Sequence, residues 1–333
     1  MIVTSSSLFS VVRYYLRKRQ ELLRYLSKHP DDWSKFQKTF NLTLDNLYQD
    51  IINFERENIN KHELKVYKLK KIFEERYRRY FLYGEFIRWS FEKPFEYAGD
   101  FKIIDGIYKN QPRTTGFDRL WDNYFQQLSI STAVRERKED LKKFILDFVK
   151  RNKDRDIRIM NLAAGPTREI KELIEADSEE LFSKVIFDCY DFDSRAIEYA
   201  RQLLNNHKNI NFFQKNAIRL AFKKDIKEEI QEDYDLIYSI GLFDYLDERV
   251  ATRLAGNLKK LLKKNGVMII SNVRDKYSNS SAGWMEWVAD WYLVYRTQTE
   301  FKELFLNAGF SSEDLKILSQ QSKIMQYCFA RAT

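Results

Sequence analysis

Short apolar runs alternate with longer segments of helical period from residue 157 onward, and this alternation restricts the fold more than any other feature of the 333-residue chain. The runs are IRIMNL, KVIFDCYDF, NINFF, YDLIYSIG, GVMIIS and IMQYCFA, and amphipathic segments such as 194–206 and 247–263 separate them. Strands separated by helices form a parallel sheet that is covered on both faces. We therefore expect the second half of the chain to be a doubly wound α/β domain.

The first part of the chain has a different pattern. Residues up to about 90 have helical period with a break at Pro30, and residues 91–118 concentrate proline and glycine in a chain that is otherwise poor in both. A further helix over 129–149 leads into the α/β half. The sequence thus predicts a helical cap domain over 1–128, with a loop region at 91–118, followed by the α/β domain over 129–333.

Composition excludes several classes of protein. Hydrophobic residues make up 44% of the chain, with 4 Pro and 10 Gly, which is typical of a globular protein. Cys189 and Cys328 lie far apart and there are three histidines, so neither a disulfide framework nor a metal site is expected. Residues 1–12 lack a basic leader and no later run approaches the roughly 18 apolar residues of a membrane span. We expect a cytoplasmic protein without a membrane crossing.

Positive charge is concentrated in the first part of the chain. Residues 1–150 hold 29 Lys and Arg against 21 Asp and Glu, whereas 151–333 hold 28 of each. Such a surplus attracts nucleic acid, anionic headgroups or an acidic protein partner. It is also typical of a solvated helix face, because the basic run 65–79 interleaves apolar residues at helical spacing.

The turn after the first apolar run has the composition of a ligand-binding turn. Residues 163–165 are small, Gly165 can adopt positive φ, and Thr167 can cap the next helix. Asp191, at the end of the second run, can accept both hydroxyls of a ribose. Asp193 is instead placed to cap the helix that begins at Ser194.

Five motifs in order, NLAAGPTRE, YDFDSRAIEYA, KNAIRL, YDLIYSIGLFDYL and LLKKNGVMIIS, resemble those of class I S-adenosylmethionine-dependent methyltransferases over about residues 130–333. The resemblance implies a seven-stranded Rossmann-like sheet and S-adenosylmethionine as cofactor. It also implies cofactor contacts by Asn161, Ala163, Gly165, Asp191, Phe192, Asn216, Ala217 and Gly241. The chain departs from the family at Asn161, where an acidic residue is usual, and at Ala163 and Thr167, where glycine is usual. A dehydrogenase would need a fuller G-x-G-x-x-G turn.

Two segments of the second half are candidates for the substrate side. In 241–246, Asp244 and Tyr245 are candidate catalytic residues and Phe243 a substrate contact, although this segment could also simply cover the sheet. In 284–296, Trp287, Trp291 and Tyr295 suggest a pocket wall, with core packing as the alternative. Arg296 could clamp a carboxylate or form an ordinary ion pair.

A narrower resemblance rests on EYAGDFKIIDGIYKN, AVRERK, GLFDYLDERVA and DWYLVYRT. These stretches are similar to the bacterial methyltransferases that make 3-hydroxy fatty acid methyl esters as extracellular signals. The resemblance implies a loop with Tyr97, Asp100 and Tyr108 that closes over the substrate, although Gly99-Asp100 alone is consistent with a plain turn. It also implies that Arg135 lies near the cofactor carboxylate.

Together these observations predict that the protein transfers a methyl group to a carboxylate oxygen of a hydrophobic small molecule such as a fatty acid. An acidic acyl carrier protein is a candidate partner of the basic cap. Two alternatives remain open. One is an RNA methyltransferase whose basic half follows phosphates, although the sequence contains no known RNA-binding module. The other is a sensor that binds the cofactor without turnover.

Overall fold

The protein, in a computed structural model that describes residues 5–333, falls into two compact units. Unit 1 contains the described residues up to Thr132 together with Lys276–Tyr292, and unit 2 contains Ala133–Asp275 and Leu293–Thr333. The division of the chain into a cap domain over 1–128 and an α/β domain over 129–333 stays a prediction. The expectation about residues 1–12 falls in part on 1–4, which lie outside the described residues.

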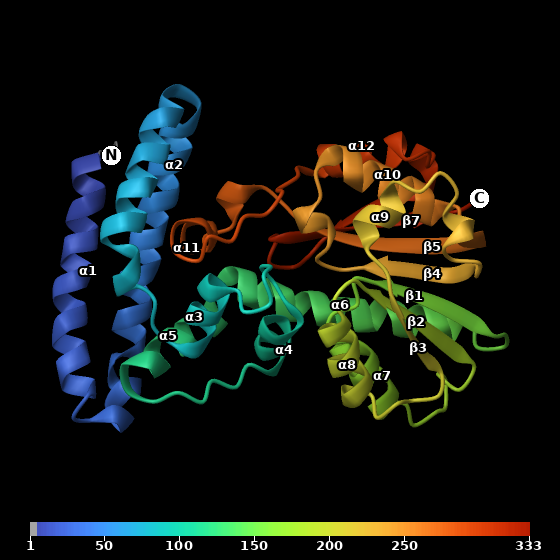
Figure 1. Ribbon diagram of the computed structural model, residues 1–333, viewed down its shortest axis with the longest axis horizontal. Helices are drawn as coiled ribbons and strands as arrows, with labels where there is room; N and C mark the ends of the chain where they lie inside the picture. Colours follow the sequence, from blue (N-terminus) through green and yellow to red (C-terminus); the bar gives the residue numbers. More distant parts are fainter. Residues whose placement is uncertain (1–4) are drawn as a thin grey trace. The chain divides into compact units, whose positions relative to one another are not determined.

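Unit 1 is helical, as predicted. Its helices are α1 (Ser5–Leu26), α2 (Ser34–Arg76), α3 (Glu85–Glu92), α4 (Phe101–Lys109), α5 (Gly116–Gln127) and α11 (Ala282–Trp287), with the first turn of α6 (Ser129–Arg151). The break at Pro30 is a short 3-10 helix, Pro30–Trp33. Helix α2 leaves helical geometry at His62 (φ −141°, ψ 46°), and its two parts then run side by side (Figure 1).

The predicted loop over 91–118 is in part wrong, because residues 101–109 form helix α4. Asp100 begins this helix by accepting hydrogen bonds from the backbone of Lys102 and Ile103. Gly106 is needed inside it, since a Cβ there would come within 2.5 Å of the Phe86 ring on α3. The glycine that suggested a loop therefore permits close packing of α3 and α4.

A buried cluster of charges joins the segment 276–292 to helix α2 within unit 1. Lys276 forms ion pairs with Glu55 and Glu286, the latter at 2.7 Å, and Lys70 lies 3.5 Å from Glu286. The indole of Trp287 donates to Glu55 at 3.0 Å. Burial alone would lower the pKa of Lys276, but the carboxylates of Glu286 and Glu55 outweigh it and raise that pKa. A segment that follows a strand of the α/β sheet is thereby fixed in the helical unit.

Unit 2 is the predicted doubly wound α/β fold with seven strands. The strands are β1 (Ile157–Leu162), β2 (Val185–Asp191), β3 (Ile210–Gln214), β4 (Tyr234–Ser239), β5 (Leu262–Val273), β6 (Leu315–Ser319) and β7 (Met325–Arg331). Their order is β3-β2-β1-β4-β5-β7-β6, and β7 runs antiparallel to both of its neighbours. The order reverses between β1 and β4, the point at which such sheets bind ligands.

Helices cover both faces of this sheet (Figure 1). Alternate residues of the strands face α9 (Ala217–Ala221), α10 (Glu248–Lys259) and α12 (Gln298–Asn307) on one side. The others face α6 and α7 (Arg168–Glu175) on the other side, with the C-terminal end of α8 (Ser194–Leu203). No helix among residues 5–333 is long and apolar enough to cross a membrane.

The charge cluster gives a stability prediction. The substitution Glu55→Gln leaves two buried cations facing one carboxylate, so we expect the free energy of unfolding to fall by about 3 kcal/mol. Urea denaturation measures this change. Glu57→Gln, at an exposed position of the same helix, is the control and should have almost no effect. Equal effects of the two substitutions would show that the cluster contributes little.

Candidate active site

The turn between β1 and α7 has an unusual backbone. Ala163, Gly165 and Thr167 all adopt positive φ, at 56°, 54° and 52°. Two of them carry side chains, for which this conformation costs on the order of 1 kcal/mol or more each. A Cβ added at Gly165 would meet no atom within 4 Å, so the turn opens onto free space. Ala163 and Thr167 thus keep a backbone conformation that favours glycine, and the methyltransferases that the sequence resembles usually have glycine at these two positions.

Asp191 at the end of β2 holds this turn. Its Oδ2 accepts from the Gly165 N–H at 2.9 Å and its Oδ1 from the Asp193 N–H at 3.0 Å. Burial raises the pKa of Asp191, and these backbone hydrogen bonds oppose the rise. A carboxylate has about four lone-pair positions, so acceptor capacity remains for ligand hydroxyls.

The two helix-capping predictions have different outcomes. Asp193 caps α8, as predicted, by accepting from the Arg195 N–H. The prediction for Thr167 is wrong: it occupies the capping position, but its side chain accepts no capping hydrogen bond and donates to the Pro166 carbonyl instead.

The neighbouring loop begins α9. Asn216 caps that helix by accepting from the Arg219 N–H, and the Lys215 N–H donates to the Asp191 carbonyl at 2.9 Å, so the two loops lie together. Phe192, which follows β2, and Ile218, on the first turn of α9, are 47% and 50% exposed. The sequence analysis did not single out Ile218, because it follows the motif residues Asn216 and Ala217.

A buried carboxyl group lies directly behind the turn. Glu169, on the first turn of α7, accepts from the Asn161 amide at 3.2 Å and from the Tyr238 hydroxyl at 3.1 Å. Burial raises the pKa of Glu169 to about 7. Asn161 occupies the strand position at which the methyltransferases that the sequence resembles usually have an acidic residue. In this chain the acidic residue is Glu169, on the helix that follows. Nothing in the sequence distinguished Glu169 from an ordinary acidic residue at a helix start.

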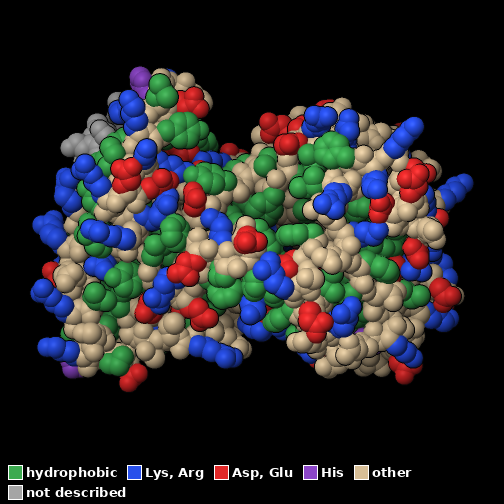
Figure 2. Space-filling model, viewed as in Figure 1, with side chains coloured by type: hydrophobic (Ala, Val, Ile, Leu, Met, Phe, Trp, Pro, Cys, Tyr) green, Lys and Arg blue, Asp and Glu red, His purple; other side chains and the backbone are tan. Residues whose placement is uncertain are grey.

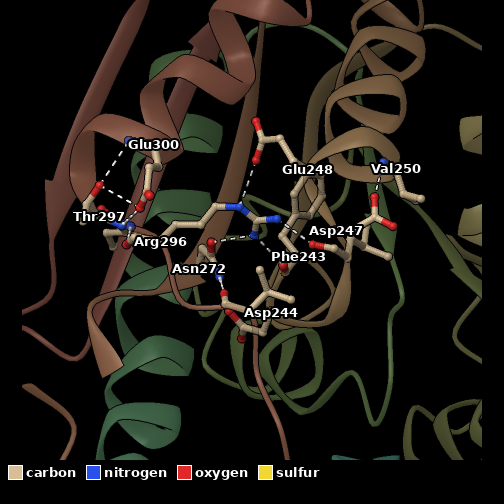
Figure 3. A network of polar contacts seen from close by, with 12 residues as sticks. Phe243, Asp244, Asp247, Glu248, Val250, Asn272, Arg296, Thr297 and Glu300 are labelled. Carbon is tan, nitrogen blue, oxygen red and sulfur yellow. Dashed lines mark hydrogen bonds and ion pairs between the residues drawn. The ribbon is translucent and has the colours of Figure 1, made fainter. Parts of the chain in front are cut away.

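The predicted catalytic residue Asp244 is part of a buried network (Figure 3). Its Oδ1 accepts from the Asn272 amide and from the Val273 N–H, both at 2.7 Å. Burial raises the pKa of Asp244, while the nearby Arg137 opposes the rise. These contacts fix the loop after β4 to the end of β5, and a catalytic role for Asp244 stays a prediction.

Arg296 is also occupied by the chain itself (Figure 3). Its guanidinium donates to the Phe243 carbonyl at 2.9 Å and the Leu246 carbonyl at 2.5 Å, to Asn272 Oδ1 at 2.9 Å and to Glu248 at 3.4 Å. Each of its three nitrogens has a protein acceptor and the residue is 3% exposed. The guanidinium thus serves the loop network of the chain, and this geometry does not support the predicted carboxylate clamp.

The other residues of 241–246 divide by burial. Phe243 is fully buried and its ring stacks on Phe305 of α12, so the core interpretation holds for it. Tyr245 is 41% exposed and stays a candidate. Gly241 adopts φ 109° at the end of β4.

The remaining predicted substrate residues lie in both units. In unit 1, Asp100 is 1% exposed, caps α4 and accepts from the Trp89 indole, while Trp287 is fully buried against Glu55. Both are therefore core residues. Of the other substrate candidates in unit 1, Tyr97 is partly buried, Tyr108 lies on α4 and not in a loop, and Trp291 is 7% exposed. In unit 2, the substrate candidate Tyr295 and the cofactor candidate Arg135 are both partly buried.

Comparison with known proteins decides the family. The Methyltransferase domain family matches residues 153–328, which is more than half of the chain. The chain belongs to this family. The methyltransferase prediction is thereby confirmed, and members of the family typically use S-adenosylmethionine. No group of three or more potential metal-ligating side chains occurs among the described residues.

Individual relatives are distant. The methyltransferase is 24% identical over 128 residues to malonyl-[acyl-carrier protein] O-methyltransferase from Halalkalibacterium halodurans, a match that covers 38% of this chain and 43% of that relative. Its fold is similar to a "possible exported protein" from Bordetella parapertussis, with TM-score 0.55, 17% identity and coverage of 89% of this chain and 96% of that one. Magnesium protoporphyrin IX methyltransferase from Synechocystis PCC 6803 gives TM-score 0.47 at 10% identity, covering 69% and 92% of the two chains.

The raised pKa of Glu169 gives a pH prediction. Because its folded pKa of about 7 lies above the ordinary value of 4.5, protonated Glu169 supports the fold below about pH 4.5, and this support is lost as the pH rises through about 7. The substitution Glu169→Gln removes this titration. The free energy of unfolding of the variant, compared with that of the wild type at the same pH, should therefore rise by about 2–3 kcal/mol between pH 5 and pH 8. Urea unfolding at both pH values measures this. Glu175→Gln, an exposed position of the same helix, should show no such change.

The contacts of Arg296 predict a stability defect. Arg296→Gln leaves two buried carbonyls and the Asn272 amide oxygen without a donor, so the free energy of unfolding should fall by about 3 kcal/mol. Arg331→Gln, at the exposed end of β7, is the control for chemical denaturation. Wild-type stability combined with a raised KM for a carboxylate acceptor would instead restore the clamp role.

Proposed function

We propose that this methyltransferase uses S-adenosylmethionine to methylate a carboxylate oxygen of a hydrophobic, fatty-acid-like small molecule. The observation that carries the cofactor assignment is the strained turn 163–167, held open by the carboxylate of Asp191 through the Gly165 N–H. Strain of this kind persists where the surroundings enforce it, and it concentrates at ligand sites. The free space above Gly165 suits the methionine end of the cofactor.

Each part of the cofactor then has candidate contacts. The remaining lone pairs of Asp191 accept the ribose hydroxyls, Phe192 and Ile218 flank the adenine, and Asn216-Ala217 face its edge. Residues Asn161, Ala163 and Gly165 lie at the methionine end, with Gly241 and Arg135 as further contacts. The bound cofactor supplies a sulfonium-activated methyl group, so the protein chiefly has to align the acceptor oxygen and exclude water.

The acceptor class rests on chemistry and on resemblance. A carboxylate is nucleophilic at neutral pH and needs no dedicated base. The malonyl group on which the Halalkalibacterium halodurans relative acts, by its name, presents a free carboxylate. The resemblance to 3-hydroxy fatty acid methyl ester synthases favours a long-chain acid. Within unit 2, Tyr245 and Tyr295 remain proposed contacts of the acceptor, and the roles of Tyr97, Tyr108 and Trp291 in unit 1 and of the buried Phe243 stay predictions.

The basic surface of unit 1 suggests an anionic partner. Helix α1 contains Arg13, Arg17, Lys18 and Arg24 against a single acid, Glu21, and a fifth basic residue, Arg19, is buried. Figure 2 shows blue side chains along the outer edge of this helix. An acyl carrier protein is acidic and delivers an acyl chain, so we propose it as the partner. Nucleic acid copurifying with the protein and released by salt would instead favour the RNA methyltransferase alternative.

The test combines binding with methyl transfer. The protein is incubated with methyl-labelled S-adenosylmethionine and hexadecanoic acid, 3-hydroxyhexadecanoic acid or malonyl-acyl carrier protein, and products are analysed by mass spectrometry. We expect a product heavier by one methylene whose label is released as methanol by alkali, as from a carboxyl ester. A base-stable label would place the methyl on another atom, and cofactor binding without transfer to any cell extract would indicate a sensor.

Asp191→Ala tests the cofactor site in the same assay. Loss of charge-assisted hydrogen bonds should weaken S-adenosylhomocysteine binding by about 1–3 kcal/mol, measured by calorimetry. Asp156→Ala, exposed just before β1, is the control and should bind as the wild type does. Unchanged binding by Asp191→Ala would refute the ribose assignment.

A further inference from the structure

Arg137 of α6 is a buried arginine whose hydrogen-bonding capacity is mostly unmet. It is 4% exposed, and its Nη1 lies 3.5 Å from Asp244 Oδ2 in a long ion pair. Its Nε has no hydrogen-bond partner among the described residues. A guanidinium carries five N–H donors, and burying it without acceptors is unfavourable. The folded chain alone therefore leaves this cation incompletely compensated.

Asp244 does not supply the missing contacts. Its Oδ1 already accepts from Asn272 and Val273, and only its Oδ2 faces Arg137, at 3.5 Å from a single nitrogen. The contrast with Arg296 is informative, since every nitrogen of that guanidinium has a protein acceptor within the same loop network. Arg296 uses four of its five N–H donors on the chain itself, whereas Arg137 leaves most of its donors for a ligand.

The guanidinium of Arg137 lies against the backbone at the carboxyl end of β4. A Cβ added to Gly241 would stand 3.2 Å from Arg137 Nη2 and 3.3 Å from Nη1. The end of β4 is joined to that of β1, because the Ser239 hydroxyl donates to the Leu162 carbonyl at 2.7 Å. Gly241 thus belongs to the edge that also carries the 163–167 turn, where sheets of this type bind ligands.

We propose that Arg137 binds a carboxylate group of a ligand at the Gly241 edge of the site. A carboxylate matches the planar fork of a guanidinium with two charge-assisted hydrogen bonds, and it provides acceptors for the N–H groups that Asp244 leaves unused. Two sources carry this group: the methionine end of the cofactor and the acceptor acid. The inference rests on the proposed function, and it replaces Arg296 by Arg137 as the carboxylate-binding arginine.

Two substitutions and two ligands test the assignment. Arg137→Gln removes the charge, Arg137→Lys keeps the charge but loses the fork, and Arg151→Gln at an exposed site of the same helix is the control. Calorimetry compares S-adenosylhomocysteine with 5′-methylthioadenosine, which lacks the amino-acid end. If the carboxylate is that of the cofactor, both Arg137 variants bind S-adenosylhomocysteine at least about tenfold more weakly and methylthioadenosine unchanged. If the bound carboxylate is that of the acceptor, both Arg137 variants bind S-adenosylhomocysteine and methylthioadenosine as the wild type does, and their KM for 3-hydroxyhexadecanoate is at least about tenfold higher.

A purely structural role makes a different prediction. If Arg137 only compensates Asp244, the double variant Arg137→Gln/Asp244→Asn should return affinity and KM to within about twofold of wild type, and that result would overturn the proposal. Wild-type affinity and KM in Arg137→Lys, the variant with the least effect on folding, would also overturn it. If 3-hydroxyhexadecanoate is not methylated at all, the proposed acceptor fails separately, and unchanged S-adenosylhomocysteine binding by both Arg137 variants would then overturn the proposal.

Discussion

The hydrogen bond between the Asp191 carboxylate and the Gly165 N–H is the constraint on which the proposed cofactor site depends. It joins the end of β2 to the turn after β1, and that turn contains two residues with side chains in a left-handed conformation. If Asp191 did not accept from the Gly165 N–H, little would stabilise this strained backbone conformation. The orientation of α7, the position of Glu169 behind the turn and the opening above Gly165 all follow from this arrangement.

Buried polar groups position the segments around the sheet. Asp244 of the loop after β4 accepts from the Val273 N–H of β5, and Arg296 donates to the Phe243 carbonyl of the same loop and to Asn272. The cluster of Glu55, Lys276 and Glu286 fixes the segment after β5 in unit 1. Buried charges of this kind contribute less net stability than an apolar core would, but leaving one of them unpaired is costly. They therefore define the conformation of loops that could otherwise adopt several.

Local sequence patterns predicted the strands and most helices because each such element is determined by the period of its own residues. The runs before residues 163 and 192 became β1 and β2, and the segment 129–149 became α6. The edge strand β6 was missed, since its five residues are only partly buried and carry little apolar signal. Helix α4 was missed because Gly106 and the nearby prolines indicate a loop, whereas the close approach of Phe86 is the reason for that glycine.

The sequence by itself determined the α/β architecture, the small-residue turn 163–167 and the acidic residue opposite it, because these depend on periodicity and on residues at the ends of neighbouring strands. Only the tertiary structure decided which polar residues serve the fold. Asp244 and Arg296 have the residue types of catalytic groups, but their partners Asn272 and Phe243 lie 28 and 53 positions away in the chain. Burial and hydrogen-bond saturation depend on which distant segments meet, and that information is not contained in the local pattern.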